Sequence, residues 1–323
     1  MNCALRLIGL FVVALLGFVG NGALAQIYPI KPIRVVVPYT PGGPVDNIGR
    51  LVASALSEGL PGIAIVENRP GADTIIGTET VVRSTPDGYT LLIANPSITM
   101  HPSLYTKLPY NAAKDLTPVG VMASASYVVV VHPSVEAKNI KELISGPANR
   151  GDMFYGSPGP NLQLAVELFK SMSSSKIELV EYSGGAPAMT ALVGGQVQFM
   201  ISPLGIAIPQ IKSGRVRAIA TTGFQRSAIL PDLPTVAEAG LPGYDALGWY
   251  GVVAPTGTPK PTIDRLSTEI VKAVKLADTQ QKLITLGMDP MPLSAEQMDQ
   301  LMTKERIKWA RVIKEAKIAQ RSL

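Results

Sequence analysis

The residues best suited to chemistry lie in a Pro-Gly-Gly turn that joins a β-branched segment to an amphipathic one. The turn occupies the sequence YTPGGPVD, from Tyr39 to Asp46. Glycines let a backbone approach a ligand closely, and the free N–H groups of a first helical turn attract anions. The segment therefore predicts a site for a carboxylate or a phosphate. It also fits a simple turn, with Pro44 in the first helical position and Asp46 offsetting the helix dipole.

Three further junctions of small residues have the same character. In YGSPGPNLQLAVELF, Ser157 to Asn161 precede an apolar helical face; in YSGGAPAMTALVGG, Gly184 and Gly185 precede a helix; and ISPLGIAIPQIKSG has Ser202 ahead of a short helix. In open α/β sheets, ligands bind beyond the carboxyl ends of the strands. Four such turns could surround one small ligand, although each alone also fits ordinary turn chemistry.

Catalytic alternatives find less support in the residues. An exported α/β hydrolase is the rival class, but its nucleophile elbow requires Gly-x-Ser-x-Gly, and YGSPG has Tyr155 in place of the first glycine. A catalytic triad needs a histidine, and the two in the chain, His101 and His132, fit the ends of strands or loops better. No Gly-Lys-Ser/Thr follows the first turn, which disfavours a P-loop. With two histidines and one cysteine, Cys3, we expect no metal site.

The elements that must position these turns alternate between short strands and amphipathic helices, which is typical of an α/β fold. Helical spacing of apolar residues is found over 48–56 and 162–169, and the tail is expected to be helical from Ser294, which has capping-box spacing to Gln297. Several strands are nearly continuous apolar runs, as in mainly parallel sheets buried on both faces. The expected strands are 33–39, 89–95, 126–132, 176–182, 197–202 and 215–222.

The start of the chain has the pattern of a secretory signal peptide. A weakly basic lead ends at Arg6, an uncharged apolar run of 13 residues spans 7–19, and Ala23-Leu24-Ala25 follows. The run is too short to span a membrane, so we expect cleavage after Ala25 and a mature periplasmic protein that is not embedded in the membrane. Cleavage leaves 298 residues, which favours two domains. The net charge of +5 comes without a basic run, so no nucleic-acid partner is expected.

Longer ordered motifs resemble the Bug family of extracytoplasmic solute receptors, the substrate-binding components of tripartite tricarboxylate transporters. They are YPIKPIRVVVPYTPGGPVD, VENRPGADTIIGTE, PDGYTLL, HPSLYTKLPYN, LPDLPTVAEAGLPGY and WYGVVAPTGTPKP. The resemblance covers essentially the whole mature chain. It implies a two-lobed periplasmic-binding-protein fold of type II, with the chain crossing between the lobes near Ser124 and Thr222. Residues 1–25 would be the signal peptide, 26–124 and 223–323 the first lobe, and 125–222 the second.

The resemblance also implies the function and the ligand-binding residues. Such receptors are not enzymes, and they hold a small carboxylate through backbone and hydroxyl donors without a cofactor or metal. The corresponding residues, with polar neighbours at the other strand ends, are Tyr39, Thr40, Pro41, Gly42, Gly43, Asp46, Asn95, Ser97, Ser157, Pro158, Gly159, Asn161, Gln163, Tyr182, Gly184, Gly185, Ala186 and Ser202. The aromatic pair Trp249 and Tyr250 either lines the cleft or packs between the lobes, and we favour packing.

The partners follow from the same resemblance. A monomeric receptor would deliver a small organic acid to membrane permease subunits, or alternatively report the ligand to a sensing partner. The second-lobe turn SPGPNLQ departs from the family pattern: it is shorter, Pro160 and Asn161 replace a Gly-Thr pair, and Gln163 replaces a histidine. Pro44 also replaces the small or hydroxyl residue that is commoner in relatives. These departures point to a different ligand, less charged or bulkier, or to no transported ligand.

Overall fold

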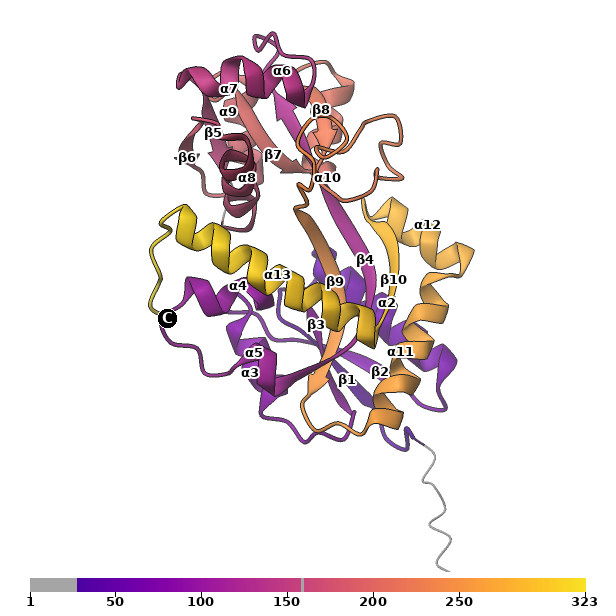
Figure 1. The fold of residues 1–323 in the computed structure, drawn as a ribbon. Helices are drawn as coiled ribbons and strands as arrows, with labels where there is room; N and C mark the ends of the chain where they lie inside the picture. The colour runs from indigo at the N-terminus through magenta and orange to yellow at the C-terminus, as the bar shows by residue number, and fades with distance from the viewer. Residues whose placement is uncertain (1–27, 158–159) are drawn as a thin grey trace, which may run out of the picture.

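The computed structural model describes residues 28–157 and 160–323, which form two lobes stacked end to end (Figure 1). The signal-peptide prediction for 1–25 lies outside the described residues, as do Pro158 and Gly159. Both ends of the described chain belong to the first lobe. Its elements are β1 (Ile33–Val37), α2 (Pro44–Gly59), β2 (Ala64–Asn68), α3 (Ile75–Val82), β3 (Thr90–Ala94), α4 (Ser97–Leu104), α5 (Ala112–Asp115), β9 (Leu247–Pro255), α11 (Lys260–Val274), α12 (Ala277–Thr285), β10 (Asp289–Ser294) and α13 (Ala295–Glu315).

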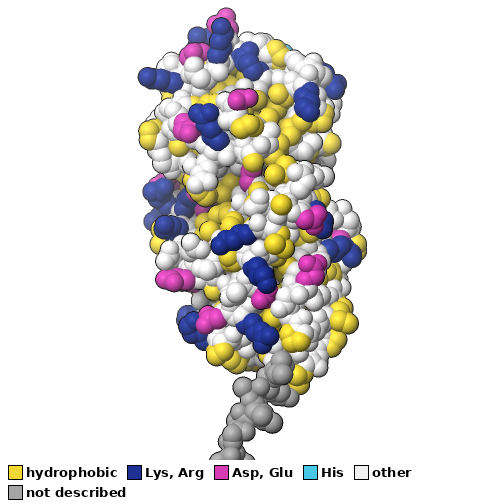
Figure 2. All heavy atoms as spheres, turned by 90° about the vertical axis from the view of Figure 1, so that its right-hand side faces the viewer, with side chains coloured by type: hydrophobic (Ala, Val, Ile, Leu, Met, Phe, Trp, Pro, Cys, Tyr) yellow, Lys and Arg dark blue, Asp and Glu magenta, His cyan; other side chains and the backbone are white. Residues whose placement is uncertain are grey.

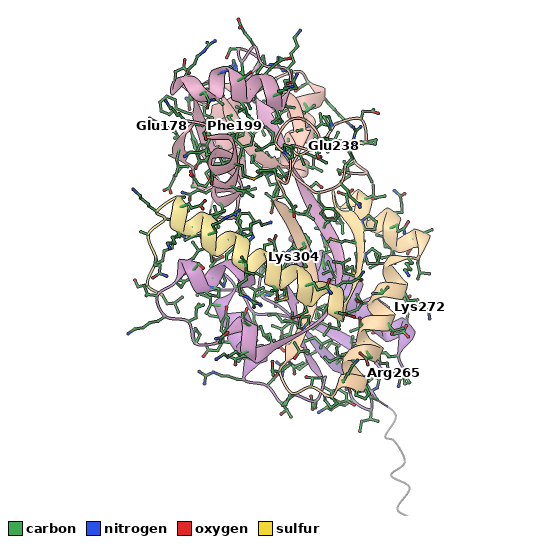
Figure 3. The ribbon with its side chains drawn as sticks, viewed as in Figure 1. Glu178, Phe199, Glu238, Arg265, Lys272 and Lys304 are labelled. Atoms are coloured by element: carbon green, nitrogen blue, oxygen red, sulfur yellow. The ribbon has the colours of Figure 1, made fainter. Side chains whose placement is uncertain are left out.

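The second lobe is built from the middle of the chain and shares one strand, β4 (Leu116–Val131), with the first. Its other elements are α6 (Ile140–Ser145), α7 (Pro147–Arg150), β5 (Phe154–Ser157), α8 (Pro160–Ser173), β6 (Glu178–Glu181), α9 (Gly185–Val193), β7 (Phe199–Pro203), α10 (Leu204–Lys212) and β8 (Arg217–Thr221). Figure 3 shows Phe199 inside this lobe, whereas Glu178 lies at its outer edge. The expected two-lobed α/β fold is therefore confirmed.

The sheet is mixed: three strands in each lobe pair in parallel, and all pairs made by the central strands β4 and β9 are antiparallel. The strand order is β2-β1-β3-β9-β4-β7-β5-β6, with β8 and β10 paired to β4. Strands β1, β2 and β3 pair in parallel, as do β5, β6 and β7, and every pair made by β4 or β9 is antiparallel. The expectation of a mainly parallel sheet thus holds for three strands in each lobe. The carboxyl ends of these strands face the junction between the lobes, where the predicted turns lie.

Strand β4 changes partners between the lobes at Ser126 and Tyr127. Ser126 is paired with Leu247 of β9, whereas Tyr127 is paired with Pro203 of β7. After β8 the chain stays against the second lobe, because Ala246 N–H donates to the Thr222 carbonyl at 3.0 Å and several side chains of 234–246 join that lobe's core. These contacts favour a second crossing near residue 247 rather than 222, and we propose this division of the chain.

Helix α13 lies across the junction and packs on both lobes (Figure 1). It begins as the sequence predicts, with a capping box in which Ser294 and Gln297 bond reciprocally. Near its end Trp309 is buried in the same core cluster as Phe169 and Phe199 of the second lobe. Lys308 donates to the Asp245 carbonyl at 2.8 Å and forms an ion pair with Glu305. The helix therefore joins the first lobe to the second along one side of the junction.

Candidate ligand-binding site

A cleft of about 500 Å³ lies between the lobes and receives residues from both. The first lobe contributes the start of α2, the turn before α3, one residue of β9 and the turn between α12 and β10. The second lobe contributes the starts of α8 and α10, and β4 supplies the floor where it crosses. The lining residues are Pro44, Asp73, Ala125, Ser126, Tyr127, Asn161, Leu162, Pro203, Leu204, Gly205, Ile206, Tyr250, Leu286, Gly287 and Met288.

Two tyrosines from the crossing strands, Tyr127 of β4 and Tyr250 of β9, are among the residues that line this cleft. Burial is the main reason that the pKa of Tyr250 is raised to about 12, and burial likewise raises the pKa of Tyr127. Both phenols are therefore protonated at neutral pH and can donate to a carboxylate. Because side chains alternate along a strand, Trp249 is fully buried while Tyr250 faces the cleft. Trp249 therefore packs in the core of the first lobe and not between the lobes, and Tyr250 lines the cleft.

A chain of hydrogen bonds joins predicted residues of the two lobes beside the cleft. Asn95 Nδ2 donates to the Tyr39 hydroxyl at 2.6 Å, and the Asn95 carbonyl oxygen Oδ1 accepts from Ser97 N–H at 3.1 Å. Asn161 of the second lobe donates to Ser97 Oγ at 3.3 Å. The structure therefore brings Tyr39, Asn95, Ser97 and Asn161 together, and Asn161 itself lines the cleft. These hydrogen bonds connect the two lobes at one edge of the cleft.

The Pro-Gly-Gly turn is organised by the buried carboxylate of Asp46. This carboxylate accepts from Gly42 N–H at 3.0 Å, from Asn68 Nδ2 at 2.9 Å and from Arg50 Nε at 2.9 Å. Burial alone would raise the pKa of Asp46, but the three donors outweigh burial and hold the pKa below its ordinary value. The Gly42 N–H is thus bonded within the turn. Among the described residues 40–46, the one that lines the cleft is Pro44.

The predicted turn after β5 reaches the cleft through α8. Asn161 and Leu162 line it, whereas Gln163 is half-buried and is not among the lining residues. Ser157 is buried at the end of β5, where its carbonyl accepts from Tyr182 N–H at 3.0 Å. The remaining predicted residues, Pro158 and Gly159, lie outside the described part of the chain.

The predicted residues after β6 and near the end of β7 are not among those that line the cleft, although the adjoining Pro203 and Leu204 are. Tyr182 packs near Gly156, and Gly185 at the start of α9 lies close to Ile206, which does line the cleft. Ser202 is fully buried, and its hydroxyl donates to the Pro203 carbonyl at 3.2 Å. Gly184 and Ala186 flank Gly185 at the beginning of the same helix and are likewise absent from the cleft lining. Contact between these predicted residues and a ligand stays a prediction.

Several lining residues were missed by reasoning from the sequence. Asp73 belongs to the motif VENRPGADTIIGTE and follows a strand end, so its position in the sequence could have identified it as a candidate for the cleft. Ser126 and Tyr127 lie inside a strand, where turn patterns do not indicate which side chains line a cleft. The turn from Leu286 to Met288 is brought to the cleft by the fold alone, because nothing in its composition marks it.

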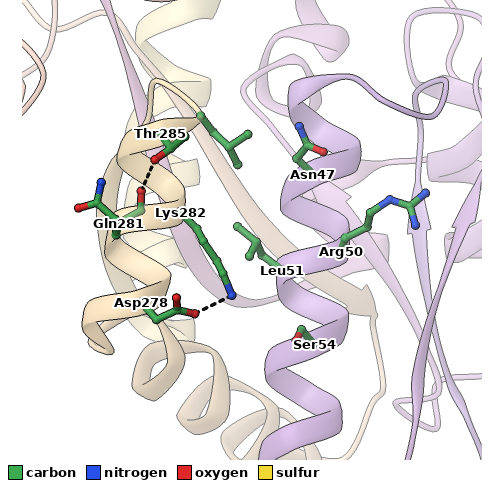
Figure 4. Close-up of a pocket in the computed structure, with 9 residues that line it drawn as sticks. Asn47, Arg50, Leu51, Ser54, Asp278, Gln281, Lys282 and Thr285 are labelled. Atoms are coloured by element: carbon green, nitrogen blue, oxygen red, sulfur yellow. Dashed lines mark hydrogen bonds and ion pairs between the residues drawn. The ribbon is translucent and has the colours of Figure 1, made fainter.

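A second hollow lies on the outside of the first lobe, between α2 and α12 (Figure 4). Its cationic side chains are already paired, Arg50 with Asp46 and Lys282 with Asp278 at 2.6 Å. Figure 2 shows that charges of both signs are scattered over the face it draws, with no single basic patch. Because this hollow is built from one lobe, we take the cleft as the candidate site.

Within residues 28–157 and 160–323, no group of three or more His, Cys, Asp or Glu side chains is placed to hold a metal ion. In the same part of the chain, no helix combines the length and the apolar character needed to cross a bilayer.

Comparisons with known proteins place the chain in a family. BugT of Bordetella pertussis is 32% identical over 320 residues, covering 98% of each chain. Among solved structures, R. palustris Rpa4515 with adipate is 34% identical, with a TM-score of 0.72 and coverage of 92% of this chain and 100% of that one. MatC from Rhodopseudomonas palustris with bound malate is 29% identical, with a TM-score of 0.68 and coverage of 88% and 100%. Residues 48–318 match the tripartite tricarboxylate transporter family receptor, and the chain belongs to this family.

Proposed function

We propose that the protein is a periplasmic receptor that binds a small organic acid in the cleft and delivers it to the permease subunits of a tripartite tricarboxylate transporter. The observation that carries the proposal is a cleft between two lobes, lined by neutral donors from both the crossing strands and the second lobe. Its volume suits a small molecule. Relatives of the same family hold adipate and malate. The receptor would act as a monomer, without enzymatic activity, cofactor or metal, after cleavage of the signal peptide behind Ala25.

Carboxylate recognition in this cleft would rely on hydrogen bonds rather than on an ion pair. No lysine or arginine is among the described residues that line it. The hydroxyls of Tyr127 and Tyr250 and the amide of Asn161 are the donors placed to reach a bound carboxylate. A hydrogen bond to a charged acceptor contributes about 1.5–3 kcal/mol, so three of them contribute at most about 9 kcal/mol, close to the roughly 8 kcal/mol of micromolar binding. Burial of the ligand against the apolar lining residues would supply the remainder.

The test is ligand-induced stabilisation of the mature protein after bound solute has been removed. Melting temperatures are measured with mono-, di- and tricarboxylates, amino acids, aromatic acids and uncharged controls. A ligand at a thousand times its Kd stabilises the folded state by about 4 kcal/mol, which is readily measured as a shift in Tm. We expect a selective shift with at least one acid. Absence of a shift with every acid would overturn the proposed function.

Matched variants test the site itself. Tyr127→Phe removes a hydroxyl in the cleft and is expected to weaken the stabilisation by ligand. Tyr244→Phe also removes a buried hydroxyl, but this one donates to the Ala165 carbonyl at 2.9 Å inside the second lobe. It should lower the Tm of the free protein and leave the ligand-induced shift unchanged. Equal ligand responses from both variants would show that the cleft is not the binding site.

A further inference from the structure

Asp73 is the one charged side chain among the described residues that line the cleft. Its side chain is 41% exposed, so the carboxylate is accessible from the cleft. The other lining residues are tyrosine, serine, asparagine, glycine or apolar residues. A bound molecule therefore meets a single formal charge of the protein, and that charge is negative.

The buried ring of His101 occupies one carboxylate oxygen of Asp73. The His101 ring is fully buried, its Nε2 lies 3.2 Å from Asp73 Oδ2, and its Nδ1 lies 3.3 Å from the Tyr110 hydroxyl. The imidazole is therefore held between Asp73 and Tyr110, and its contact with the carboxylate is to Oδ2 rather than to the other oxygen, Oδ1.

One oxygen of Asp73 is left for a ligand. The Tyr105 hydroxyl donates to Oδ2 at 3.2 Å, and Nε2 of His101 uses the same oxygen. Within residues 28–157 and 160–323, no hydrogen bond to Oδ1 is found. A carboxylate oxygen accepts about two hydrogen bonds, so Oδ1 can receive a donor that enters the cleft.

The backbone fixes Asp73 in this position. Ala72, Asp73 and Thr74 have φ values of 44°, 49° and 75°, in a region that residues with side chains seldom adopt. The turn is closed by Ile75 N–H, which donates to the Ala72 carbonyl at 3.0 Å, and it leads directly into α3. Such conformations persist where the surrounding structure determines them. The carboxylate is therefore placed by the fold, and is not a loose side chain at the rim.

We propose that Asp73 accepts a hydrogen bond from an ammonium group of the ligand, so that the ligand is an amino acid or another acid that also carries an amine. This inference rests on the proposed function and specifies its ligand class. A second carboxylate near Asp73 would bring like charges together in a partly desolvated cleft, whereas an ammonium group brings an attractive pair. The apolar wall formed by Leu204, Ile206 and Met288 suits an aliphatic body between the two charged groups.

Six-carbon acids that differ in one group provide the test. The probes are hexanoate, 6-hydroxyhexanoate, 6-aminohexanoate, 2-aminohexanoate and adipate, titrated calorimetrically into the mature protein after removal of bound solute. We expect at least one of the two amino acids to bind about tenfold to hundredfold more tightly than adipate and hexanoate, the range of a charge-assisted hydrogen bond. Adipate binding as tightly as both amino acids would overturn the inference.

Variants at Asp73 identify the source of the preference. Asp73→Asn keeps the shape and a residue that tolerates positive φ, and Asp73→Gly relaxes the backbone while removing the carboxylate. Both should abolish the preference for the amino acid over adipate. Asp264→Asn is the control, because this exposed aspartate pairs with Lys260 on α11 and does not line the cleft.

The outcomes separate this inference from the proposed function. A preference that survives both Asp73 variants would overturn the assignment of Asp73, even if acids bind well. Binding of the acids without any preference would overturn the ligand class and leave the receptor function standing. No binding by any acid in this series or in the broader panel would overturn the proposed function, and the inference with it.

Discussion

Replacing Asp46 by alanine tests whether one buried carboxylate organises the Pro-Gly-Gly turn. Its side chain is 2% exposed, and it accepts hydrogen bonds from the turn, from β2 and from its own helix. Asn68 also donates to the Tyr39 carbonyl at 3.0 Å, so the substitution removes one of its two bonds. The variant therefore releases the Gly42 end of the turn, while Asn68 still holds Tyr39, and it creates no large cavity.

The cost can be worked out bond by bond. A hydrogen bond from Asn68 to a buried, ionised acceptor contributes about 1.5–3 kcal/mol. The bond from exposed Gly42 contributes about 0.5–1 kcal/mol because water replaces it. The Arg50 side chain is 59% exposed, so its pair with Asp46 adds about 0–1 kcal/mol. We expect Asp46→Ala to lower the free energy of unfolding by about 2–5 kcal/mol, and Arg50→Ala to lower it by less than about 1 kcal/mol.

Urea unfolding of the mature protein measures both variants, with the slope of the transition checked for constancy. The pKa of Asp46 is held below its ordinary value, so its stabilisation is fully present above about pH 3.9 and is lost as the pH falls through the folded-state pKa. The difference between wild type and Asp46→Ala should shrink over that acidic range. An Asp46→Ala cost below about 1 kcal/mol, or an equal cost for Arg50→Ala, would refute the reasoning.

Three further predictions concern the cleft and the junction. Gly248→Val places a Cβ 2.9 Å from the Tyr127 hydroxyl, so calorimetry should show weaker ligand binding. Asn161→Ala removes the bond to the first lobe and should weaken binding about threefold to tenfold, whereas Gln163→Ala should leave the Kd unchanged; the reverse result would contradict the site. Burial raises the pKa of Asp245, so its contribution to stability declines as pH rises from about 3.9 through the folded-state pKa. Asp245→Asn should flatten that decline in a series of Tm measurements, and an unchanged pH profile would refute it.

Strands with a strong local signal were predictable from the sequence, and those determined by long-range packing were not. The valine run of β4 is evident, but the strand begins ten residues earlier than its predicted start, at Leu116. That earlier half contains Gly120, Ala123 and Ser124, which have weak strand preference, and it is held by pairing with β9 and β10 on either side. The edge strand β2 is short and partly exposed, so its alternation of apolar and polar residues was too brief to predict a strand. Tertiary pairing overrode local preference in both cases.

The region of the candidate site was predictable, and most of its lining was not. Turn chemistry indicated strand ends that lie beside the cleft, where Tyr39, Asn95, Ser97 and Asn161 converge. Contact of these residues with a ligand stays a prediction. It could not show that the Gly42 N–H is bonded to Asp46. It also could not place side chains that project from within a crossing strand. These orientations depend on strand register and on elements more than a hundred residues apart.

The positions of the cleft residues bear on how a ligand could close the receptor. Tyr127 and Tyr250 lie on the strands that join the lobes, whereas Asn161 and Ile206 belong to the lobe that would rotate. Residues near the axis of lobe rotation move little, so the two tyrosines can hold a ligand in the open and closed forms alike. Residues far from that axis, such as Asn161 and Ile206, contact the ligand in the closed form. Ligand would then favour closure through contacts of the second lobe, and scattering measurements should show a smaller radius of gyration with ligand. Loss of that compaction in Asn161→Ala, with residual binding retained, would separate the two sets of contacts.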